Sequence, residues 1–376
     1  MARLDWEILY AVYGVSETDV TSQVLSVNFT TGRQKYLDNY SGQTASITIK
    51  NDNNQAASYA LNKNIVIQIQ STPGNYYYRQ HFWIQEITFN DYPGNTGLST
   101  ATITAVDWIS RSGRMQAVSK SLTQTDTTSQ LEQFNWNVGG PLTEDMYFEA
   151  DPGTSIASSQ TYTGTVGNQL NLLSVTERSQ VWCFQNAIGI IPRSYPIDAS
   201  TISFGRTVSS SQIGYQDFVR VQNGTNFVNT VTVSPNGLAT QTATNSSSVT
   251  TYGTSFYSSA TVDYTTTQAL GNAQWVANTF SDPTDLRFEI VFTDLSQNET
   301  AILTFLYEFY MKQYVLNYQT QGQSATSENV RVEGFNVNIT PEQTTFTVYF
   351  SPANYYQYFI LNSTTLGILD TSRLGW

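Results

Sequence analysis

The side chains best suited to chemistry in this sequence are few and scattered. His81 is the single histidine and lies in RQHFWIQEI, and Cys183 is the single cysteine and lies in WCF. A histidine can act as a general base, and a cysteine with a lowered pKa can act as a nucleophile. A histidine within an apparent strand is more often an ordinary strand or interface residue, and a cysteine in an apolar strand usually behaves as a small hydrophobic residue. We therefore predict no Ser-His-Asp or Cys-His centre.

Other reactive arrangements are equally sparse. Glu144 and Asp145 are adjacent, and paired carboxylates serve glycosidases, but a solvated loop after GGPLTE is the preferred interpretation. Zinc usually needs several Cys or His ligands, and no Asp-rich calcium loop or Gly-rich phosphate loop occurs. The sequence predicts no catalytic, cofactor-binding or metal-binding residue and no enzyme.

Composition narrows the function further. The 376 residues carry 17 Lys and Arg against 29 Asp and Glu, a net charge of -12, so no basic face is available to neutralise phosphates. We therefore expect no sequence-specific nucleic-acid binding, although an acidic wall would let DNA slide past without sticking. Only 12% of residues are charged, while Tyr (24) and Phe (19) are abundant. Such surfaces suit a protein packed against copies or partners, where each buried charge would need a partner of its own.

The cysteine content and the length of the apolar runs bear on disulfides and on membrane-spanning segments. One cysteine permits no internal disulfide. No apolar run reaches about 18 residues, and the first residues lack a secretion signal, so we expect no membrane-spanning segment.

The first part of the chain alternates in the manner of strands. TASITIK (44–50) and IVIQIQ (65–70) each place isoleucines on one face, and a further strand, YYYRQHFWIQEITFN, lies between the turn sequences TPGN and YPGN. STATITAVDW then completes a β-domain over 1–110. Sequential strands with short turns indicate an antiparallel barrel or sandwich.

Residues 111–200 mix helix and strand signals. Asp126 is positioned to cap a short helix, and a second helix in GNQLNLLSVTERSQ places Leu170 and Leu173 inward. WCFQNAIGIIPRS reads as a hairpin with its turn at 186–189.

Beyond residue 200 we predict strands in TISFGRT, NTVTVSPNG, SSATVDY, LRFEIVFTD and the two-strand segment VRVEGFNVNITPEQTTFTVYFSP. One amphipathic helix stands among them, ended by Pro283, and its inward residues are Ala269, Ala273, Val276, Ala277 and Phe280.

The order of these segments resembles tailed-bacteriophage minor tail proteins and tail-tip (baseplate) hub proteins. An N-x-V-x-V strand, a Ser-rich segment with Tyr-Gly, a strand, an Ala-containing helix and a Pro correspond to Asn229, Val231, Val233, Ser247, Ser248, Tyr252, Gly253, Ala269, Ala277 and Pro283. The N-terminal counterparts are Gly32, Arg33, Leu37, Asp38, Gly42, Ala45 and Asn51. One departure is plain: Arg178-Ser179-Gln180 replaces the usual Gly-rich turn after the acidic residue.

The resemblance implies a mainly β fold with α+β insertions. It implies two β-barrel-like domains, one over 1–110 and one assembled from 201–235 and 328–376. A mixed α+β domain would cover 111–200, and an inserted α+β domain would cover 236–327.

The same resemblance implies a structural virion protein, the tail hub at the distal tip of the virion tail, assembled in the host bacterial cytoplasm. Such a hub is a homotrimer that joins the distal tail protein or tail tube protein to tail fibre or tip proteins. Its neighbours include the tape-measure protein, and DNA passes through its lumen only in transit, during genome ejection.

Two alternatives stay open. A hexameric distal tail protein belongs to the same structural class, although the helix-and-strand region 165–325 argues against it. A host-binding adhesin would stack glycans on aromatic loops such as YYYRQHFW or NYYQYF, but aromatics in alternating strands are more often core or interface residues.

The C-terminal run LDTSRLGW is the one segment whose composition predicts docking. Leu369, Leu374 and Trp376 would anchor it through apolar contacts, while Asp370 pairs locally with Arg373. We predict that these five residues contact the protein's own barrel or a neighbouring subunit, with a frayed end as the alternative.

Overall fold

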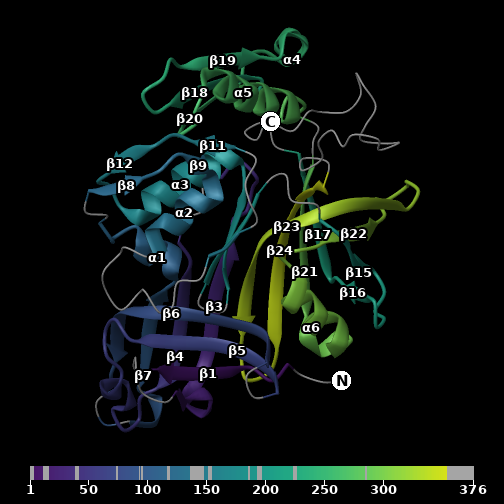
Figure 1. The fold of residues 1–376 in the computed structure, drawn as a ribbon. Coiled ribbons are helices and arrows are strands. Elements are labelled where there is room, and N and C mark those ends of the chain that lie inside the picture. The colour runs from purple at the N-terminus through teal and green to yellow at the C-terminus, as the bar shows by residue number, and fades with distance from the viewer. Residues whose placement is uncertain are drawn as a thin grey trace.

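The computed structural model of the chain describes residues 4–11, 17–38, 42–72, 75–92, 94, 96–116, 119–135, 148–150, 155–184, 187–192, 197–222, 227–283 and 286–353. Its largest element is a sheet of 14 strands, and two smaller groups of helices and strands are arranged around it (Figure 1). The expectation of a mainly β chain with α+β parts is confirmed.

The N-terminal half of the large sheet follows from alternating sequence. Its strands are β1 (Glu7–Ala11), β2 (Thr18–Asp19), β3 (Val24–Gly32), β4 (Thr44–Lys50), β5 (Asn64–Thr72), β6 (Asn75–Asn90) and β7 (Thr100–Val106). In β4 the alternation buries Ala45, Ile47 and Ile49, each at most 1% exposed. These strands pair antiparallel in the order β3-β4-β7-β6-β5-β1-β2.

The C-terminal half contains β15 (Ala199–Gly205), β16 (Gln212–Gly214), β17 (Asp217–Gln222), β21 (Leu286–Thr293), β22 (Gln313–Tyr318), β23 (Thr326–Ile339) and β24 (Thr344–Pro352). β15 pairs parallel with β16 and β22, and the other pairs are antiparallel. The path of neighbouring strands ends at β16 and at β2, so within the described residues this sheet does not close on itself.

β23 joins the two halves. Its first part pairs with β22 and its second part with β3, while β24 pairs along its other edge. A single hydrophobic core accordingly spans both halves. Tyr78 of β6 lies 6.3 Å from Phe335 of β23, between ring centroids, and Phe335 lies 6.1 Å from Phe305 of helix α6 (Glu299–Glu308).

A middle α+β group lies beside the N-terminal strands (Figure 1). Its helices are α1 (Trp108–Ser112), α2 (Thr127–Asn135) and α3 (Val166–Glu177), and its strands are β8 (Lys120–Leu122), β9 (Thr125–Asp126), β10 (Phe148–Ala150), β11 (Ile156–Ala157), β12 (Gln160–Tyr162), β13 (Gln180–Phe184) and β14 (Ala187–Ile191). The predicted cap is confirmed, because Ser129 N donates to Asp126 Oδ1 at 2.9 Å. Leu170 and Leu173 of α3 are buried as predicted. The predicted turn at 186–189 was wrong, since Phe184 pairs with Ala187 and the second strand begins there.

The second of the smaller groups, at the top of Figure 1, covers residues 227–283 and is called the small unit below. It contains β18 (Thr230–Pro235), β19 (Gln241–Thr244), α4 (Ser246–Tyr252), β20 (Phe256–Thr261) and α5 (Thr266–Thr279). The strands form a separate sheet in the order β19-β18-β20. All five inward residues predicted for the helix are buried. Elsewhere in the described ranges, short 3-10 helices occur at η1 (Thr21–Gln23), η2 (Gln55–Ser58), η3 (Thr96–Leu98) and η4 (Asp294–Ser296).

Strands of the region 236–327 are thus divided between two sheets: β19 and β20 lie in the small unit, whereas β21 and β22 lie in the large sheet. Sheet membership does not fix domain boundaries. The predicted division at residues 110, 200, 235 and 327 therefore stays a prediction.

Candidate functional site

The centre of the molecule is built around an irregularity in β23. Pairing with β22 ends at Arg331, pairing with β3 begins at Gly334, and a β-bulge falls between Val332 and Gly334. Glu333 therefore lies between the two ladders. A bulge re-aims the local side chain, and here it directs a carboxylate into the interior.

Close backbone approach accompanies this bulge. Gly32, the last residue of β3, has φ of +73°, and a Cβ atom there would lie 2.3 Å from the carbonyl oxygen of Glu333. Glycine is therefore required on both conformational and steric grounds. The next backbone amide, of Arg33, donates to that same carbonyl at 2.8 Å.

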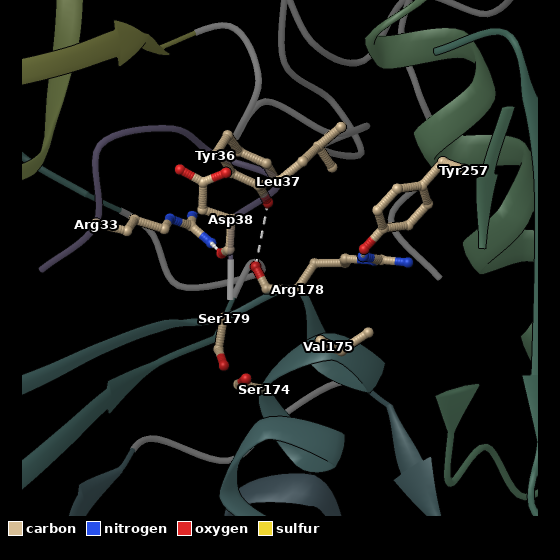
Figure 2. A pocket seen from close by; sticks show the side chains of 9 residues that line it. All are labelled: Arg33, Tyr36, Leu37, Asp38, Ser174, Val175, Arg178, Ser179 and Tyr257. Atoms are coloured by element: carbon tan, nitrogen blue, oxygen red, sulfur yellow. Dashed lines mark hydrogen bonds between the residues drawn. The ribbon is translucent and has the colours of Figure 1, made fainter. Parts of the chain in front are cut away.

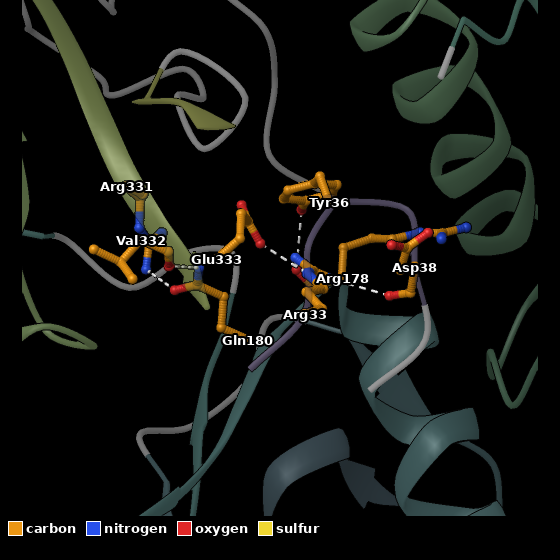
Figure 3. Close-up of polar contacts among 8 residues, drawn as sticks. All are labelled: Arg33, Tyr36, Asp38, Arg178, Gln180, Arg331, Val332 and Glu333. Carbon is orange, nitrogen blue, oxygen red and sulfur yellow. Dashed lines mark hydrogen bonds and ion pairs between the residues drawn. The ribbon is translucent and has the colours of Figure 1, made fainter. Parts of the chain in front are cut away.

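Arg33 and Glu333 form a buried ion pair (Figure 3). Arg33 Nε lies 2.7 Å from Glu333 Oε2, and the two side chains are only 7% and 0% exposed. The Arg33 guanidinium also lies 4.6 Å from the ring centroid of Tyr36 and donates to the carbonyl of Asp38 at 3.4 Å. A charge pair so far from solvent needs these additional contacts to offset desolvation.

A second set of contacts attaches the middle α+β group to β23. Gln180, the first residue of β13, donates from Nε2 to the carbonyl of Val332 at 3.2 Å and accepts a hydrogen bond from Arg331 Nη2. Both Gln180 and Arg331 are buried. One amide side chain therefore satisfies a backbone acceptor and a guanidinium donor at the same bulge.

Arg178 makes the corresponding attachment to the small unit. It follows the last turn of α3 in the left-handed conformation, with φ of +57°. Its Nε donates to Asn272 of α5 at 2.8 Å, and its Nη atoms donate to Tyr257 and Ser259 of β20 at 3.3 and 3.2 Å. No carboxylate of the described chain forms an ion pair with Arg178, so its charge is stabilised by neutral oxygens.

Tyr36 connects the Arg33–Glu333 pair with Arg178. Its hydroxyl donates to the carbonyl of Arg178 at 3.1 Å, and its ring lies 5.7 Å from Trp275 and 5.2 Å from Phe280 between centroids. Residues from the N-terminal strands, the C-terminal strands, the middle group and the small unit therefore meet here. We call Arg33, Tyr36, Arg178, Gln180, Arg331 and Glu333 the central junction.

The central junction is suited to holding parts together. Guanidinium groups stay protonated in proteins and have no acceptor capacity, so they do not shuttle protons. Their hydrogen bonds are directional and connect four separate parts of the chain. The geometry therefore favours fixing the mutual orientation of these parts over acid-base chemistry.

A small pocket opens at the same place (Figure 2). Its empty volume of about 290 Å³ includes the solvent at its mouth, which puts it below the usual size of small-molecule sites. It is lined by Arg33, Tyr36, Leu37, Asp38, Ser174, Val175, Arg178, Ser179 and Tyr257.

His81 lies on β6 beside Arg79, whose Nε is 3.2 Å from His81 Nε2. Burial, and secondly the charge of Arg79, lower the pKa of His81 to about 3. The imidazole is therefore neutral and weakly basic at physiological pH. These surroundings favour the ordinary strand interpretation.

Cys183 lies on β13 in the core formed by the middle group. Burial, and secondly the nearby Asp107 carboxyl, raise the pKa of the Cys183 thiol well above its usual value. A buried thiol that resists ionisation is a poor nucleophile. Asp107 itself caps α1, accepting from Ser110 N at 2.8 Å, and burial raises its pKa to about 6.

Other predicted residues fall elsewhere. Glu144, Asp145 and the predicted docking residues Leu369, Asp370, Arg373, Leu374 and Trp376 lie outside the described residues. Among the residues that are described, no group of three or more His, Cys, Asp or Glu side chains is placed to hold a metal ion. Over the same ranges, no helix combines the length and apolar character needed to cross a membrane.

Sequence reasoning did not identify the central junction, but one signal pointed to it. The Arg178-Ser179-Gln180 departure from the Gly-rich turn places an arginine in a left-handed position that usually favours glycine. The structure shows what that arginine does there, since its side chain holds the small unit.

Comparisons with known proteins give a consistent fold. No protein-family model and no curated protein matches the sequence. The tail protein from Neisseria meningitidis MC58 matches with a TM-score of 0.61 at 10% identity, over 93% of this chain and 97% of its own.

Two further solved structures match over a similar share of the chain. The prophage MuSo2 43 kDa tail protein from Shewanella oneidensis matches with a TM-score of 0.58 at 10% identity, over 94% of this chain and 98% of its own. Prophage tail protein gp18 from Listeria monocytogenes EGD-e gives 0.52 at 9% identity, over 91% and 94%. The chain has the fold of these tail proteins.

Proposed function

We propose that this chain, which has the fold of the phage tail proteins described above, is a structural component of a bacteriophage tail, and specifically the hub at the distal end. The observation that carries the proposal is the extent of the likeness. It spans 91% or more of this chain and 94% or more of each of the three tail proteins. The shared feature is therefore the arrangement of all the parts, and not one common domain.

As a hub, the chain forms a homotrimer in which each subunit contributes two barrel-like domains around a DNA-conducting channel. It joins the distal tail protein or tail tube protein to the tail fibre or tip proteins, with the tape-measure protein as a further neighbour. The central junction supports this role, because a buried ion pair and neutral hydrogen bonds hold the parts of each subunit in one orientation. A rigid subunit suits a ring that must close through repeated contacts.

A role without catalysis accords with the chemistry of the site. The His81 imidazole is a weak base because its pKa is lowered to about 3, and burial holds the Cys183 thiol in its protonated form. Low total charge, 12% of residues, suits surfaces that are covered in an assembly.

Immunogold labelling of intact virions tests the proposal. Antibodies raised against the purified chain should label the distal tip of the tail and nothing else. Label along the whole tube or on the capsid would refute the hub position. Absence from purified virions that contain all other tail proteins would refute a structural tail role altogether.

A further inference from the structure

The pocket beside the central junction contains hydrogen-bond donors that have no acceptor among the described residues. Arg178 uses its Nε–H and one N–H of each Nη atom on Asn272, Tyr257 and Ser259. Each Nη atom carries a second N–H, and no described residue accepts from it. Arg178 is only 5% exposed, so water reaches these groups poorly. Its charge is also held by neutral oxygens alone, which leaves it without a counter-ion in the described chain.

Two hydroxyl groups in the same pocket also lack an acceptor (Figure 2). Ser179 is 2% exposed, and its Oγ has no hydrogen-bond partner in the described part of the chain. The Tyr257 hydroxyl accepts from Arg178 at 3.3 Å, but it donates its own proton to no described residue. Leaving a buried hydroxyl without a partner costs free energy. The Ser179 hydroxyl therefore indicates an acceptor that comes from outside the described residues.

These donors determine what kind of group fits the pocket. The group must accept several hydrogen bonds and carry negative charge, and a carboxylate does both. Asp38 lines the pocket but does not fill this role, because it is exposed and forms no ion pair with Arg178. Figure 2 shows the Arg178 side chain extending away from Asp38 toward Tyr257. Leu37 and Val175, both half-buried, add an apolar part to the lining.

The last strand of the large sheet brings the chain to this place. Ser351 of β24 pairs with Arg331 of β23, and Arg331 donates to Gln180, which lies beside Ser179 in the sequence. The described chain ends shortly afterwards, at Ala353. Since an extended residue spans about 3.3 Å, the segment that follows is long enough to reach any part of the pocket.

The segment 354–376 contains a single carboxylate side chain, Asp370, and an apolar residue, Leu369, comes directly before it. We propose that Asp370 occupies the pocket of its own chain. Its carboxylate accepts hydrogen bonds from the guanidinium and the two hydroxyls described above, and Leu369 packs against the apolar part of the lining. This inference goes beyond the proposed function, because it concerns how one subunit holds its own C-terminal segment.

Tryptic cleavage after Arg373 measures this docking. Arg373 is the only lysine or arginine after Arg331, and it lies close to Asp370 in the sequence. We expect the protease to reach this bond only when the segment leaves the pocket, so the cleavage rate reports the population of the open form. Mass spectrometry follows the bond in the folded full-length chain. A synthetic peptide of residues 365–376, carrying the same substitution where there is one, gives the rate for a free segment.

Two single variants test the contacts of the carboxylate. Asp370→Asn should be cleaved about tenfold faster than the parent chain, each measured against its own peptide, because the charge-assisted hydrogen bonds are lost. Ser179→Ala should be cleaved about fivefold faster, the effect of one hydrogen bond. Ser179 Oγ has no described partner, so an empty pocket would give no change in this variant.

The matched control is Glu342→Gln, which removes an exposed carboxylate between β23 and β24. It should stay within about twofold of the parent. Circular dichroism establishes that each variant is folded.

A double-mutant cycle separates the pocket from the small unit. Arg178→Met also removes the hydrogen bonds to α5 and β20, so its own effect on cleavage is not specific. Once Arg178 is replaced, however, Asp370 has lost its main partner. The double variant Arg178→Met/Asp370→Asn should therefore be cleaved about as fast as Arg178→Met alone.

Mixing two variants shows whose pocket is filled. Arg178→Met chains keep Asp370, and Asp370→Asn chains keep the pocket, so exchange between chains would protect the segment of the Arg178→Met chain. With that chain isotopically labelled, we expect no such protection, and we expect the parent rate to be the same over a dilution series. Protection on mixing would overturn the assignment to the same chain and would place Asp370 of a second copy in the pocket.

Three other results would overturn the proposal as a whole. They are a parent chain cleaved as fast as its peptide, an Asp370→Asn effect no larger than that of Glu342→Gln, and independent effects of Arg178→Met and Asp370→Asn in the double variant. None of these results bears on labelling of the tail tip, so the proposed function and this inference fail separately.

Discussion

Breaking the Arg33–Glu333 pair should be among the most damaging polar changes in the protein. Unit charges about 4 Å apart attract by about 4 kcal/mol at the effective dielectric constant of a protein near its surface, and this pair lies deeper, at 7% and 0% side-chain exposure. The Arg33→Met and Glu333→Leu variants each leave the other charge buried without its counter-ion. We expect either variant to lower the free energy of unfolding by about 3–5 kcal/mol.

The double variant Arg33→Met/Glu333→Leu separates the effect of leaving a buried charge unpaired from the effect of changing the side-chain shapes. Removing both charges leaves no buried ion, and apolar replacement of a buried pair is often neutral or stabilising. We therefore expect the double variant to be less destabilised than either single variant. Urea unfolding followed by tryptophan fluorescence reports on all four proteins and yields the coupling energy.

A surface pair serves as the control. Lys312 Nζ lies 3.4 Å from Asp198 Oδ2, and the Asp198 side chain is 85% exposed. Asp198→Asn should change stability by less than about 0.5 kcal/mol, because exposed pairs contribute little. Single variants at Arg33 and Glu333 with equally small effects, or a double variant whose loss equals the sum of the single losses, would show that the reasoning about the central junction is wrong.

Three further predictions follow from groups described above. The folded protein holds the Asp107 proton more tightly than the unfolded chain, with a pKa of about 6 against 3.8, so this group's contribution to stability is complete below pH 3.8 and is lost as the pH rises to 6. Asp107→Asn, which keeps the cap on α1, should stabilise the protein by up to about 3 kcal/mol at pH 8 and much less at pH 4, and an equal effect at both pH values in urea titrations would contradict this. For His81 the effect of pH on stability has the opposite sign, because its pKa falls from 6.5 to about 3 on folding. Its contribution to the free energy of unfolding is present above pH 6.5 and is lost as the pH falls below that value. The His81→Gln variant should therefore show a flatter fall in stability on the acid side of a stability-pH profile. Gly32→Ala should lower the melting temperature more than Gly237→Ala, because both glycines have φ of +73° but only Gly32 would place its Cβ against Glu333; similar losses in calorimetry would mean that backbone conformation alone matters.

Local sequence patterns correctly predicted those helices and strands that bury one face and expose the other. The alternation in 44–50 and the spacing of Ala269, Ala273, Val276 and Ala277 each matched an observed strand or helix, because one face is buried and the other is not. Helix α6 was missed. Its sequence ETAILTFLYE is apolar on most sides, as in a buried strand, and its main helical signal is Asn298, whose Oδ1 accepts from Ala301 N at 3.3 Å.

The central junction was beyond local patterns for another reason. Arg33, Gln180 and Glu333 are distant in sequence, and they meet because β23 changes partner at its bulge. Register of this kind depends on tertiary packing, which no short window contains. The Gly-Arg at 32–33 belongs to the family resemblance, but its structural reason, a close approach to the backbone of β23, depends on the three-dimensional arrangement.

The pairing of β23 with strands of both halves also has a mechanical consequence. Hydrogen bonds in an antiparallel ladder run perpendicular to the strands, so a pull along β23 loads many bonds together in shear instead of opening them one at a time. Force applied to one half of the large sheet therefore reaches the other half through a single continuous strand. In the proposed tail hub, this strand would be the path along which tension travels through the subunit.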